Sequence, residues 1–219
     1  MMQKATTCLV KDLGLIGYAQ AYEFQKKCVQ DLLQGGPQVL ILCEHPPVLT
    51  LGRMAKRSNI LVSHEELAKY SVGIHAIDRG GDITLHAPGQ AVMYPIFNLS
   101  HMGKDLRRYL RHLEQVAIDL LKGFGIVANR IPGYTGVWIE KKKIASVGIG
   151  VRRWVSFHGL SINVNTDLEL FSMIRPCGLN VQVTSIQEIK GRRIDMAEVK
   201  QKIIRCFKEN FLLDLLSGE

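Results

Sequence analysis

Long stretches of β-type sequence separate the helical segments, and this constrains the fold more than any other feature of the chain. Residues 72–99 predict strands joined by turns, with breaks at residues 80–81 and 88–89. Residues 136–164 predict strands again, with a turn around residues 140–142. A doubly wound parallel sheet would instead need single strands alternating with helices. We therefore expect an α+β fold with a central mixed or antiparallel sheet flanked by helices.

Three longer segments have the apolar spacing of amphipathic helices. The first begins at Tyr18 and ends at Gly35-Gly36-Pro37, and the last runs from about Asp195 to Asn210. The middle one covers about 104–122 and ends at Gly123. Its apolar face comprises Leu106, Tyr109, Leu110, Leu113, Val116, Ala117, Leu120 and Leu121.

Shorter elements complete the prediction. Residues 4–11, 39–43 and 48–51 are expected to form strands, and a capping-box pattern at Ser63 predicts a short helix to about Tyr70. The chain has 219 residues, of which 47% are hydrophobic, so it can bury a core without disulfides or a structural metal. We expect residues 1–219 to form one domain.

The cysteines do not form a metal-binding or disulfide pattern. They are five in number and far apart, with no C-x-x-C pair. They are Cys8, Cys28, Cys43, Cys177 and Cys206. Residues 1–10 lack the features of a signal or transit peptide, and no apolar run approaches the roughly 20 residues of a membrane helix. We expect free thiols in a cytoplasmic protein that holds no metal and does not associate with a membrane.

The formal net charge is +8, which attracts acidic partners over a long range. Nucleic acid and acidic carrier proteins both fit this charge. Aromatic residues make up only 7% of the chain, and no base-stacking motif accompanies the basic residues. We therefore expect no nucleic acid partner.

Four segments carry candidate chemistry. The first is RGGDITLHAPGQ (79–90), where adjacent glycines allow a close approach of the backbone to a ligand, although a glycine turn with a surface histidine is the simpler interpretation. It lacks the spacing of a phosphate-binding loop. The second is the lysine run at 141–143, in which Lys143 opens an apolar strand and is expected to point inward.

The other two candidates are His158 and Cys177. His158 precedes a glycine in a predicted strand, where a structural histidine is the default interpretation. Cys177 lies between Pro176 and Gly178, in a turn that can expose its sulfur, whereas the other cysteines lie in strands or helices. A reactive thiol needs partial exposure and a nearby positive charge, which Lys143 or His158 could supply.

Taken in order, these segments resemble a known family. RGGDITLHAPGQ, then GVWIEKKKIASVGIGVRRWVSFHGLSINVNTDL and RPCGL, preceded by CEHPPVLTLGR, are similar to the octanoyltransferases of lipoate biosynthesis, the lipoate–protein ligase B family. The resemblance covers about residues 39–180 and implies the α+β fold shared by lipoate and biotin protein ligases.

The resemblance implies roles for individual residues. Cys177 would carry the acyl group as a thioester, and Lys143 would manage the protons. N–H groups near Gly178 and in the Val147-Gly148 strand would hold the oxyanion. The implied substrate-binding residues are Arg79, Gly80, Gly81, Asp82, Ile83, Thr84, Leu85, His86, Ser146, Val147, Gly148, Gly159, Leu160 and Ser161. His86 and His158 would shape the site.

The implied reaction is the first step of endogenous protein lipoylation. An octanoyl group would pass from octanoyl-acyl carrier protein to lipoyl domains of 2-oxoacid dehydrogenases and to the glycine cleavage H protein. No ATP, metal or other cofactor would be needed, and a monomer is expected. Leu85 and Ala87 depart from the family pattern, which commonly has an aromatic residue and a glycine there. These departures affect the expected shape of the acyl pocket rather than the reacting groups.

Three alternatives remain open from the residues. An ATP-dependent lipoate or biotin ligase would share the fold but would need an adenylate site and no nucleophilic cysteine. A cysteine hydrolase using Cys177 with His158 would release free octanoate. A non-catalytic acyl- or carrier-binding protein would tolerate loss of the Cys177 thiol.

Overall fold

The computed structural model describes residues 6–178 and 181–217, and seven strands of this part of the chain form one sheet in the order β10-β1-β2-β6-β9-β8-β7. The strands are β1 (Thr6–Leu15), β2 (Gln38–Glu44), β6 (Gln90–Ile96), β7 (Val137–Ile139), β8 (Lys142–Arg152), β9 (Val155–Asn163) and β10 (Leu213–Ser217). The β10–β1 and β1–β2 pairs are parallel and the other pairs are antiparallel. The expected mixed sheet is confirmed.

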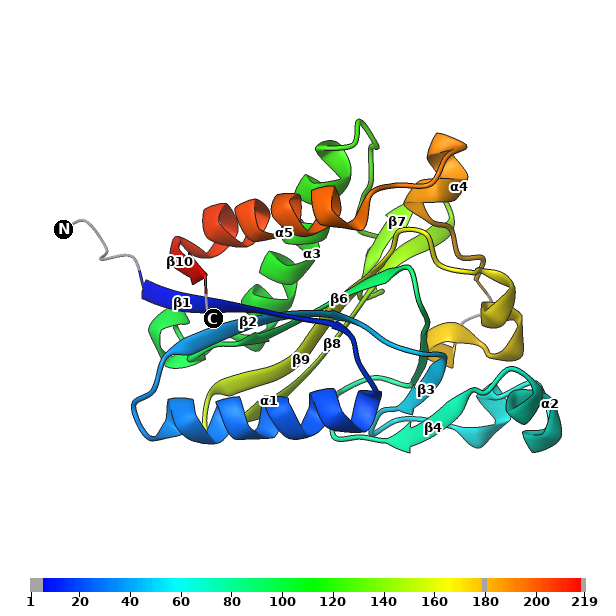
Figure 1. Cartoon of the computed structure of the whole chain (residues 1–219), viewed down its shortest axis with the longest axis horizontal. Coiled ribbons are helices and arrows are strands. Elements are labelled where there is room, and N and C mark those ends of the chain that lie inside the picture. Colours follow the sequence, from blue (N-terminus) through cyan, green and yellow to red (C-terminus); the bar gives the residue numbers. More distant parts are fainter. Residues whose placement is uncertain (1–5, 179–180, 218–219) are drawn as a thin grey trace.

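Helices cover both faces of this sheet (Figure 1). Helix α1 (Tyr18–Leu33) lies on one face, and α3 (Leu106–Lys122) and α5 (Met196–Phe211) lie on the other. Strand β2 shows why both faces need cover: Leu40 packs toward α3 and α5, whereas Ile41 packs toward α1. Successive side chains of a strand point to opposite faces, so a strand that is apolar throughout becomes buried on both.

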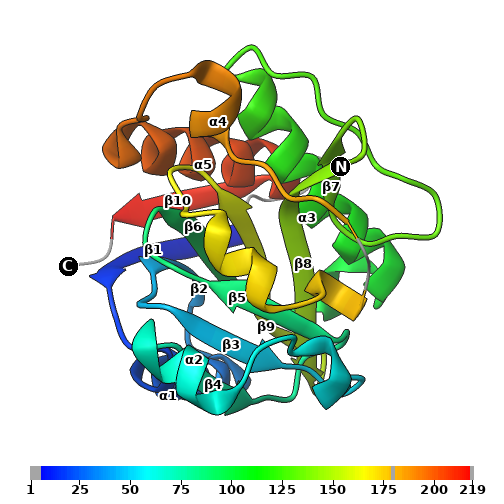
Figure 2. The ribbon, with the colours of Figure 1, turned by 90° about the vertical axis from the view of Figure 1, so that its right-hand side faces the viewer.

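A smaller sheet lies beside one end of the larger one (Figure 2). Its order is β4-β3-β5, from β3 (Val48–Leu51), β4 (Gly73–Ala76) and β5 (Ile83–His86). A third apolar core lies against it and includes residues of α2 (His64–Lys69) and of the 3₁₀ helix η3 (Glu169–Met173). The remaining short elements are η1 (Arg57–Asn59), η2 (Leu99–Met102), η4 (Pro176–Gly178) and α4 (Ile186–Lys190).

The predicted helices are present near their expected limits, whereas one strand, one α-helix and the four 3₁₀ helices were not expected. Ser63 caps α2 by accepting a hydrogen bond from the Glu66 N–H, and Gly123 is the C-cap of α3. Strand β10 and helix α4 were missed, and β1 continues to Leu15 instead of ending at residue 11. Strand β10 is a short segment that pairs in parallel with β1. Its partner lies at the other end of the chain, so no local signal announces it.

A buried carboxylate joins α3 to the loop that leads into β7. Glu114 is 1% exposed and accepts hydrogen bonds from Arg111 Nη1 (2.6 Å), Arg130 Nε (3.0 Å) and the Gly136 N–H (3.0 Å). Two guanidinium groups and an amide thus compensate the cost of burying the charge. Among the described residues, no helix combines the length and apolar character needed to cross a bilayer.

Replacing Glu114 with alanine should lower the free energy of unfolding by about 3 kcal/mol, because the two arginines and the Gly136 amide lose their shared acceptor. Urea denaturation of Glu114→Ala measures this loss. Glu209→Ala, an exposed glutamate of α5, is the matched control and should change stability by less than about 0.5 kcal/mol. Equal effects of the two substitutions would contradict the role assigned to Glu114.

Candidate active site

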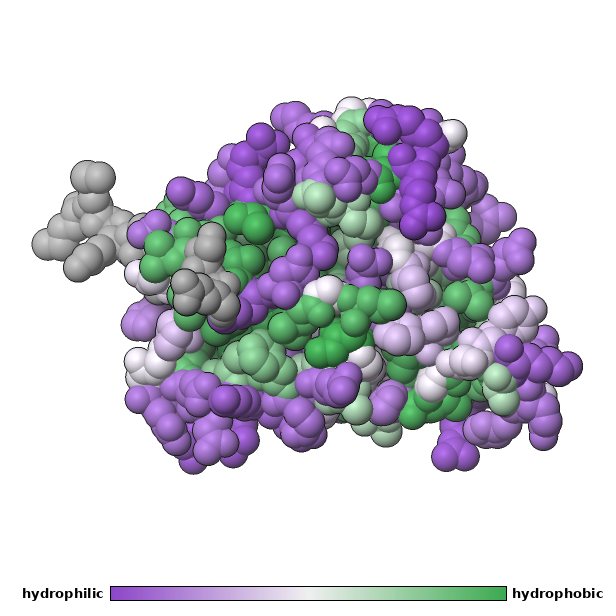
Figure 3. All heavy atoms as spheres, in the orientation of Figure 1, coloured by the Kyte–Doolittle hydropathy of each residue, from purple (hydrophilic) through white to green (hydrophobic). Residues whose placement is uncertain are grey.

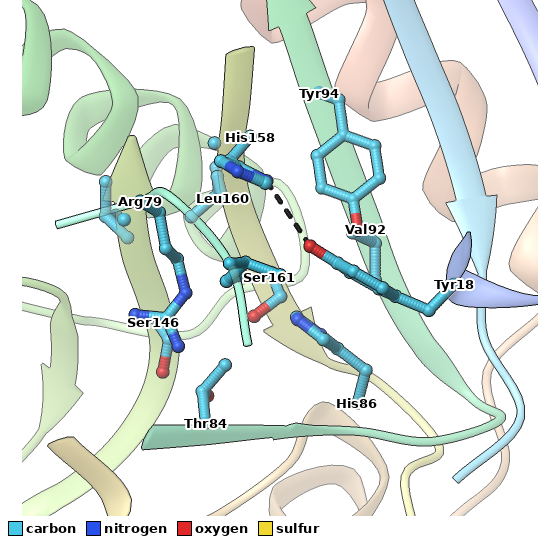
Figure 4. Close-up of a pocket in the computed structure, with 14 residues that line it drawn as sticks. Tyr18, Arg79, Thr84, His86, Val92, Tyr94, Ser146, His158, Leu160 and Ser161 are labelled. Carbon is cyan, nitrogen blue, oxygen red and sulfur yellow. Dashed lines mark hydrogen bonds between the residues drawn. The ribbon is translucent and has the colours of Figure 1, made fainter. Parts of the chain in front are cut away.

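A small cavity lies where α1, β5, β6, β8 and β9 meet (Figure 4). Its volume is about 30 Å³, which is close to the share of one water molecule in the liquid. Nine residues of the predicted binding set line it, namely Arg79, Thr84, His86, Ser146, Val147, Gly148, Gly159, Leu160 and Ser161. The structure adds Tyr18, Ile77, Val92, Tyr94 and His158 to the lining.

Two glycines paired across β8 and β9 give the cavity its floor. Gly148 lies opposite Gly159, and Ser146 lies opposite Ser161. A Cβ atom added to Gly148 would lie 3.0 Å from Cδ of Arg79, and one added to Gly159 would lie 2.6 Å from Cδ of Pro95. Each position is therefore glycine because a neighbour approaches the backbone too closely for a side chain.

Arg79 places a permanent positive charge in the cavity wall. Its residue is 7% exposed, and its guanidinium donates to the Thr50 carbonyl (2.9 Å), the Thr50 hydroxyl (3.1 Å) and the Gly80 carbonyl (3.0 Å). These three acceptors orient the guanidinium at the cavity wall.

His86 is held as a neutral hydrogen-bond acceptor. Gln90 Nε2 donates to Asn163 Oδ1 (2.9 Å), so Gln90 Oε1 must accept the 2.6 Å bond from Nδ1–H of His86. Nε2 of His86 is then the unprotonated nitrogen. Burial lowers the pKa of His86 to about 3, and the neighbouring His45 acts in the same direction. This imidazole is uncharged at neutral pH.

His158 belongs to a second polar group beside the cavity. Its Nε2 lies 3.1 Å from Oδ1 of Asp78, which also accepts a hydrogen bond from the Tyr22 hydroxyl (2.7 Å). The Tyr18 hydroxyl lies 3.4 Å from Nδ1 of His158, as Figure 4 shows. The hydrogen bond from His158 lowers the pKa of Asp78 to about 2, and burial lowers the pKa of His158. We infer a neutral His158 that donates to an ionised Asp78 and accepts from Tyr18.

Five residues of the predicted binding set do not line the cavity. Gly80 and Gly81 precede β5, and Asp82 bonds to other parts of the chain. Ile83 and Leu85 point into the third apolar core, because alternation along β5 turns only Thr84 and His86 toward the cavity. Leu85 and Ala87 both belong to that core, so their departure from the family pattern affects the cavity only through the position of β5.

A β-bulge turns Lys143 toward the cavity side of the sheet. Trp138 pairs with Lys143 and Val137 pairs with Ala145, so Ile144 is an extra residue in β8. In a regular strand Lys143 would share the face of Ala145. The extra residue reverses this and puts Lys143 on the face that carries Ser146. Lys143 is 2% exposed, and its Nζ lies 5.3 Å from the centroid of the Trp138 ring.

The backbone brings the Pro176–Gly178 turn close to the glycine-rich segment. A Cβ added to Gly178 would lie 2.7 Å from Oδ2 of Asp82. The Gly178 N–H donates to the Arg175 carbonyl (2.9 Å), so it is not available to an oxyanion in this conformation. Cys177 belongs to this turn by its backbone, but its side chain lies outside the described part of the structure.

The other four cysteines are unsuited to nucleophilic chemistry. Cys8, Cys28, Cys43 and Cys206 are all buried and unpaired. Burial raises the pKa of the Cys8 thiol to about 12, those of Cys28 and Cys206 to about 11, and that of Cys43 further. Their thiolates are therefore scarce at neutral pH. Among the described residues, no group of three His, Cys, Asp or Glu side chains is placed to hold a metal ion.

Tyr18, Asp78 and Tyr94 were not predicted as site residues, because the sequence places them in a helix, before a motif and in an apolar strand. Tyr18 is the first residue of α1, and Tyr94 lies in the mostly apolar and wholly buried strand β6. Asp78 directly precedes Arg79, the first residue of the glycine-rich motif, and this position is the sequence feature that could have indicated it as a site residue.

The neutral His86 should make the protein less stable in acid. In the unfolded chain an imidazole gains a proton below about pH 6.5, whereas folded His86 stays neutral down to about pH 3. The unfolded state thus binds more protons in this window, and His86 contributes a loss of up to about 1.4 kcal/mol per pH unit as pH falls. His86→Asn should show a shallower decline than the wild type in urea denaturation from pH 7 to pH 4. The exposed His64→Asn serves as the control and should keep the wild-type slope.

The sequence is similar to that of a known family over most of its length. Residues 17–208 match the family described as Lipoyl protein ligase A/B catalytic domain. An octanoyltransferase of Syntrophotalea carbinolica is 47% identical over 201 residues, covering 91% of this chain and 92% of the relative. An octanoyltransferase of Clostridium kluyveri is 40% identical over 215 residues, covering 97% and 92%.

Solved structures share the fold at low sequence identity. A bi-partite lipoate protein ligase from Thermoplasma acidophilum superposes with a TM-score of 0.74 at 16% identity, covering 98% of this chain and 87% of that one. A biotin protein ligase from Aquifex aeolicus gives a TM-score of 0.52 at 14% identity, covering 94% and 68%. The expected fold is confirmed. The chain therefore belongs to the lipoyl protein ligase A/B catalytic-domain family and, within it, to the octanoyltransferases, which are acyltransferases.

Proposed function

We propose that this chain transfers an octanoyl group from octanoyl-acyl carrier protein to a lysine of lipoyl domains, through a thioester on Cys177. The observation that carries the proposal is the placement of Lys143. The Lys143 N–H donates to the Gln182 carbonyl (2.8 Å), and Gln182 lies five residues after Cys177. The bulge in β8 turns this buried lysine to the cavity side of the sheet.

The first half-reaction moves the acyl group to the enzyme. Lys143 takes the proton of the Cys177 thiol, and the thiolate attacks the carbonyl carbon of the carrier-bound thioester. The bond to the carrier sulfur breaks, and the Lys143 ammonium returns the proton to the departing thiolate. One thioester replaces another at nearly constant free energy, so the step needs no ATP.

The second half-reaction releases the product. Lys143 accepts a proton as the acceptor lysine amine attacks the acyl-enzyme, and it passes that proton to the Cys177 thiolate as the C–S bond breaks. An amide forms in place of a thioester, which makes this step favourable. The N–H groups of the Val147-Gly148 strand are the remaining candidates for the oxyanion, because the Gly178 N–H is already bonded.

The cavity described above is our candidate for the acyl pocket. Val92, Val147 and Leu160 supply apolar lining, and Arg79 and His86 supply polar groups. Its volume of about 30 Å³ is too small for an eight-carbon chain. An acyl chain would therefore extend beyond this cavity or displace some of its lining side chains.

The partners and setting follow from the same proposal. We propose lipoyl domains of 2-oxoacid dehydrogenases and the glycine cleavage H protein as acceptors, with no ATP, metal or nucleic acid involved. Residues 1–219 would act as a single catalytic domain, as a monomer in the cytoplasm. Support comes from the family match, which spans residues 17–208.

The decisive experiment is intact mass spectrometry after incubation with octanoyl-acyl carrier protein, with ATP omitted. The wild type should gain one octanoyl group, and Cys177→Ala should gain none because the nucleophile is absent. Cys28→Ala is the matched control and should be acylated like the wild type. An adduct on Cys177→Ala, or none on the wild type, would overturn the proposal. Release of free octanoate without transfer would favour a hydrolase instead.

Lys143→Met keeps the length of the side chain but removes its ability to move a proton. Single-turnover acylation of Cys177, followed by quenched-flow mass spectrometry, should slow by about 10²–10⁴-fold. Lys141→Met, an exposed lysine in the β7–β8 turn, should acylate at the wild-type rate. Retention of the wild-type rate by Lys143→Met would remove Lys143 from the mechanism.

A further inference from the structure

Four basic residues belong to the segment 52–60 and to the residue before the Pro176–Gly178 turn, and these two segments contact each other. They are Arg53, Lys56, Arg57 and Arg175, all exposed, and we call them the cationic rim. We propose that this rim is the docking surface for the acidic protein that delivers the acyl thioester. The inference rests on the proposed function and adds to it the surface that receives the donor.

Backbone contacts fix the rim against the turn that carries Cys177. The Arg175 N–H donates to the Asn59 carbonyl (2.8 Å), and Ile60 forms a β-bridge with Ile174. Figure 2 shows η1 in cyan beside the orange turn of η4. A partner bound to the rim therefore lies next to the proposed nucleophile.

Asp82 holds these segments together. Its carboxylate accepts from Asn59 Nδ2 (2.6 Å), the Lys56 N–H (3.1 Å) and the Ile83 N–H (2.7 Å). A Cβ atom added to Gly178 would lie 2.7 Å from the same carboxylate, so the turn passes close to it. Asp82 is thus engaged with backbone and amide donors, and these bonds join the rim to the glycine-rich segment.

The charge of the rim is not balanced within the described part of the protein. None of its four side chains forms an ion pair with another described residue. Residues 52–60 contain three cationic side chains and no acidic one. Met54 (68% exposed) and Leu61 (48% exposed) add apolar surface to the same region. A basic rim with exposed apolar residues fits an acidic protein surface.

A groove lies beside Arg175 of the rim and Pro176 of the turn. Its volume is about 530 Å³, and Leu61, Arg175, Lys142 and Val183 are among its lining residues. Lys142 is paired with Glu188 (3.1 Å), which leaves Glu169 as the unpaired acid in the lining of the groove. Figure 3 shows hydrophilic side chains over the adjoining α2 end of the molecule.

Charge decides between the two protein substrates. A carrier-bound thioester hangs on a phosphopantetheine arm, so the donor presents a phosphodiester together with its acidic surface. The acceptor presents a lysine ammonium, which four nearby cations repel. The rim therefore favours the donor, and its attraction should weaken as salt screens it over a Debye length of about 8–10 Å.

The test compares two donors in single-turnover acylation of Cys177. Octanoyl-acyl carrier protein carries the phosphate and the acidic surface, whereas octanoyl-pantetheine carries neither. Lys56→Glu and Arg57→Glu should each lower the second-order rate constant with the carrier protein by about tenfold and flatten its salt dependence. Both should react with octanoyl-pantetheine at the wild-type rate. Arg107→Glu is the control, because it makes the same charge change at an exposed site of α3. This site follows η2, and the Leu99 N–H of η2 donates to the Trp154 carbonyl just after the end of β8.

The outcomes separate this inference from the proposed function. If the wild type is not acylated by either donor, the proposed function fails. If the wild type is acylated but the rim variants match Arg107→Glu, the rim is not the donor surface. An equal loss of acylation rate with both donors would mean that the rim acts on the catalytic site itself. A loss of rate confined to transfer onto the lipoyl domain would assign the rim to the acceptor. Each of these last two results overturns the inference.

Discussion

The antiparallel pairing of β8 with β9 is the interaction on which the rest of the site depends. It runs without interruption from Ala145↔Ile162 to Arg152↔Val155. On one side it presents the Ser146–Ser161 and Gly148–Gly159 pairs to the cavity, and on the other side Ile162 packs in the core that α3 and α5 share. A shift of one residue in the pairing would turn the serine and glycine pairs away from the cavity. The core therefore holds the floor of the site in register.

The regular alternation of β8 is interrupted by a β-bulge near the residues proposed for catalysis. The bulge at Ile144 breaks the alternation and moves Lys143 to the cavity side. The cost is a buried lysine, which lies over the Trp138 ring. Glu114 reaches the adjoining loop from α3 and holds Gly136, whose lack of a side chain leaves room for Cε of Lys143. The helix, the loop and the bulge thus act together on one side chain.

The two histidines of the cavity wall are neutral, whereas the cations of the rim are exposed. Burial keeps His86 and His158 uncharged, so Arg79 is the fixed cation of the cavity wall. The cationic rim lies outside, where water and salt moderate its charge. Such a division lets surface charge select and steer a protein partner while the cavity stays apolar enough for an acyl chain. Asp82 joins the two regions, since it belongs to the glycine-rich segment and accepts hydrogen bonds from Asn59 and the Lys56 N–H.

The sequence by itself determined the long helices, the mixed sheet and the family. These follow from local periodicity, caps and ordered motifs, which are properties of neighbouring residues. The tertiary structure alone decided which face of β5 meets the cavity, how His86 is protonated, and that β10 pairs with β1. Alternation separates Thr84 and His86 from Ile83 and Leu85 but does not say which pair faces a ligand. That choice depends on partners remote in the chain, namely Phe171 on one side of β5 and Tyr18 on the other.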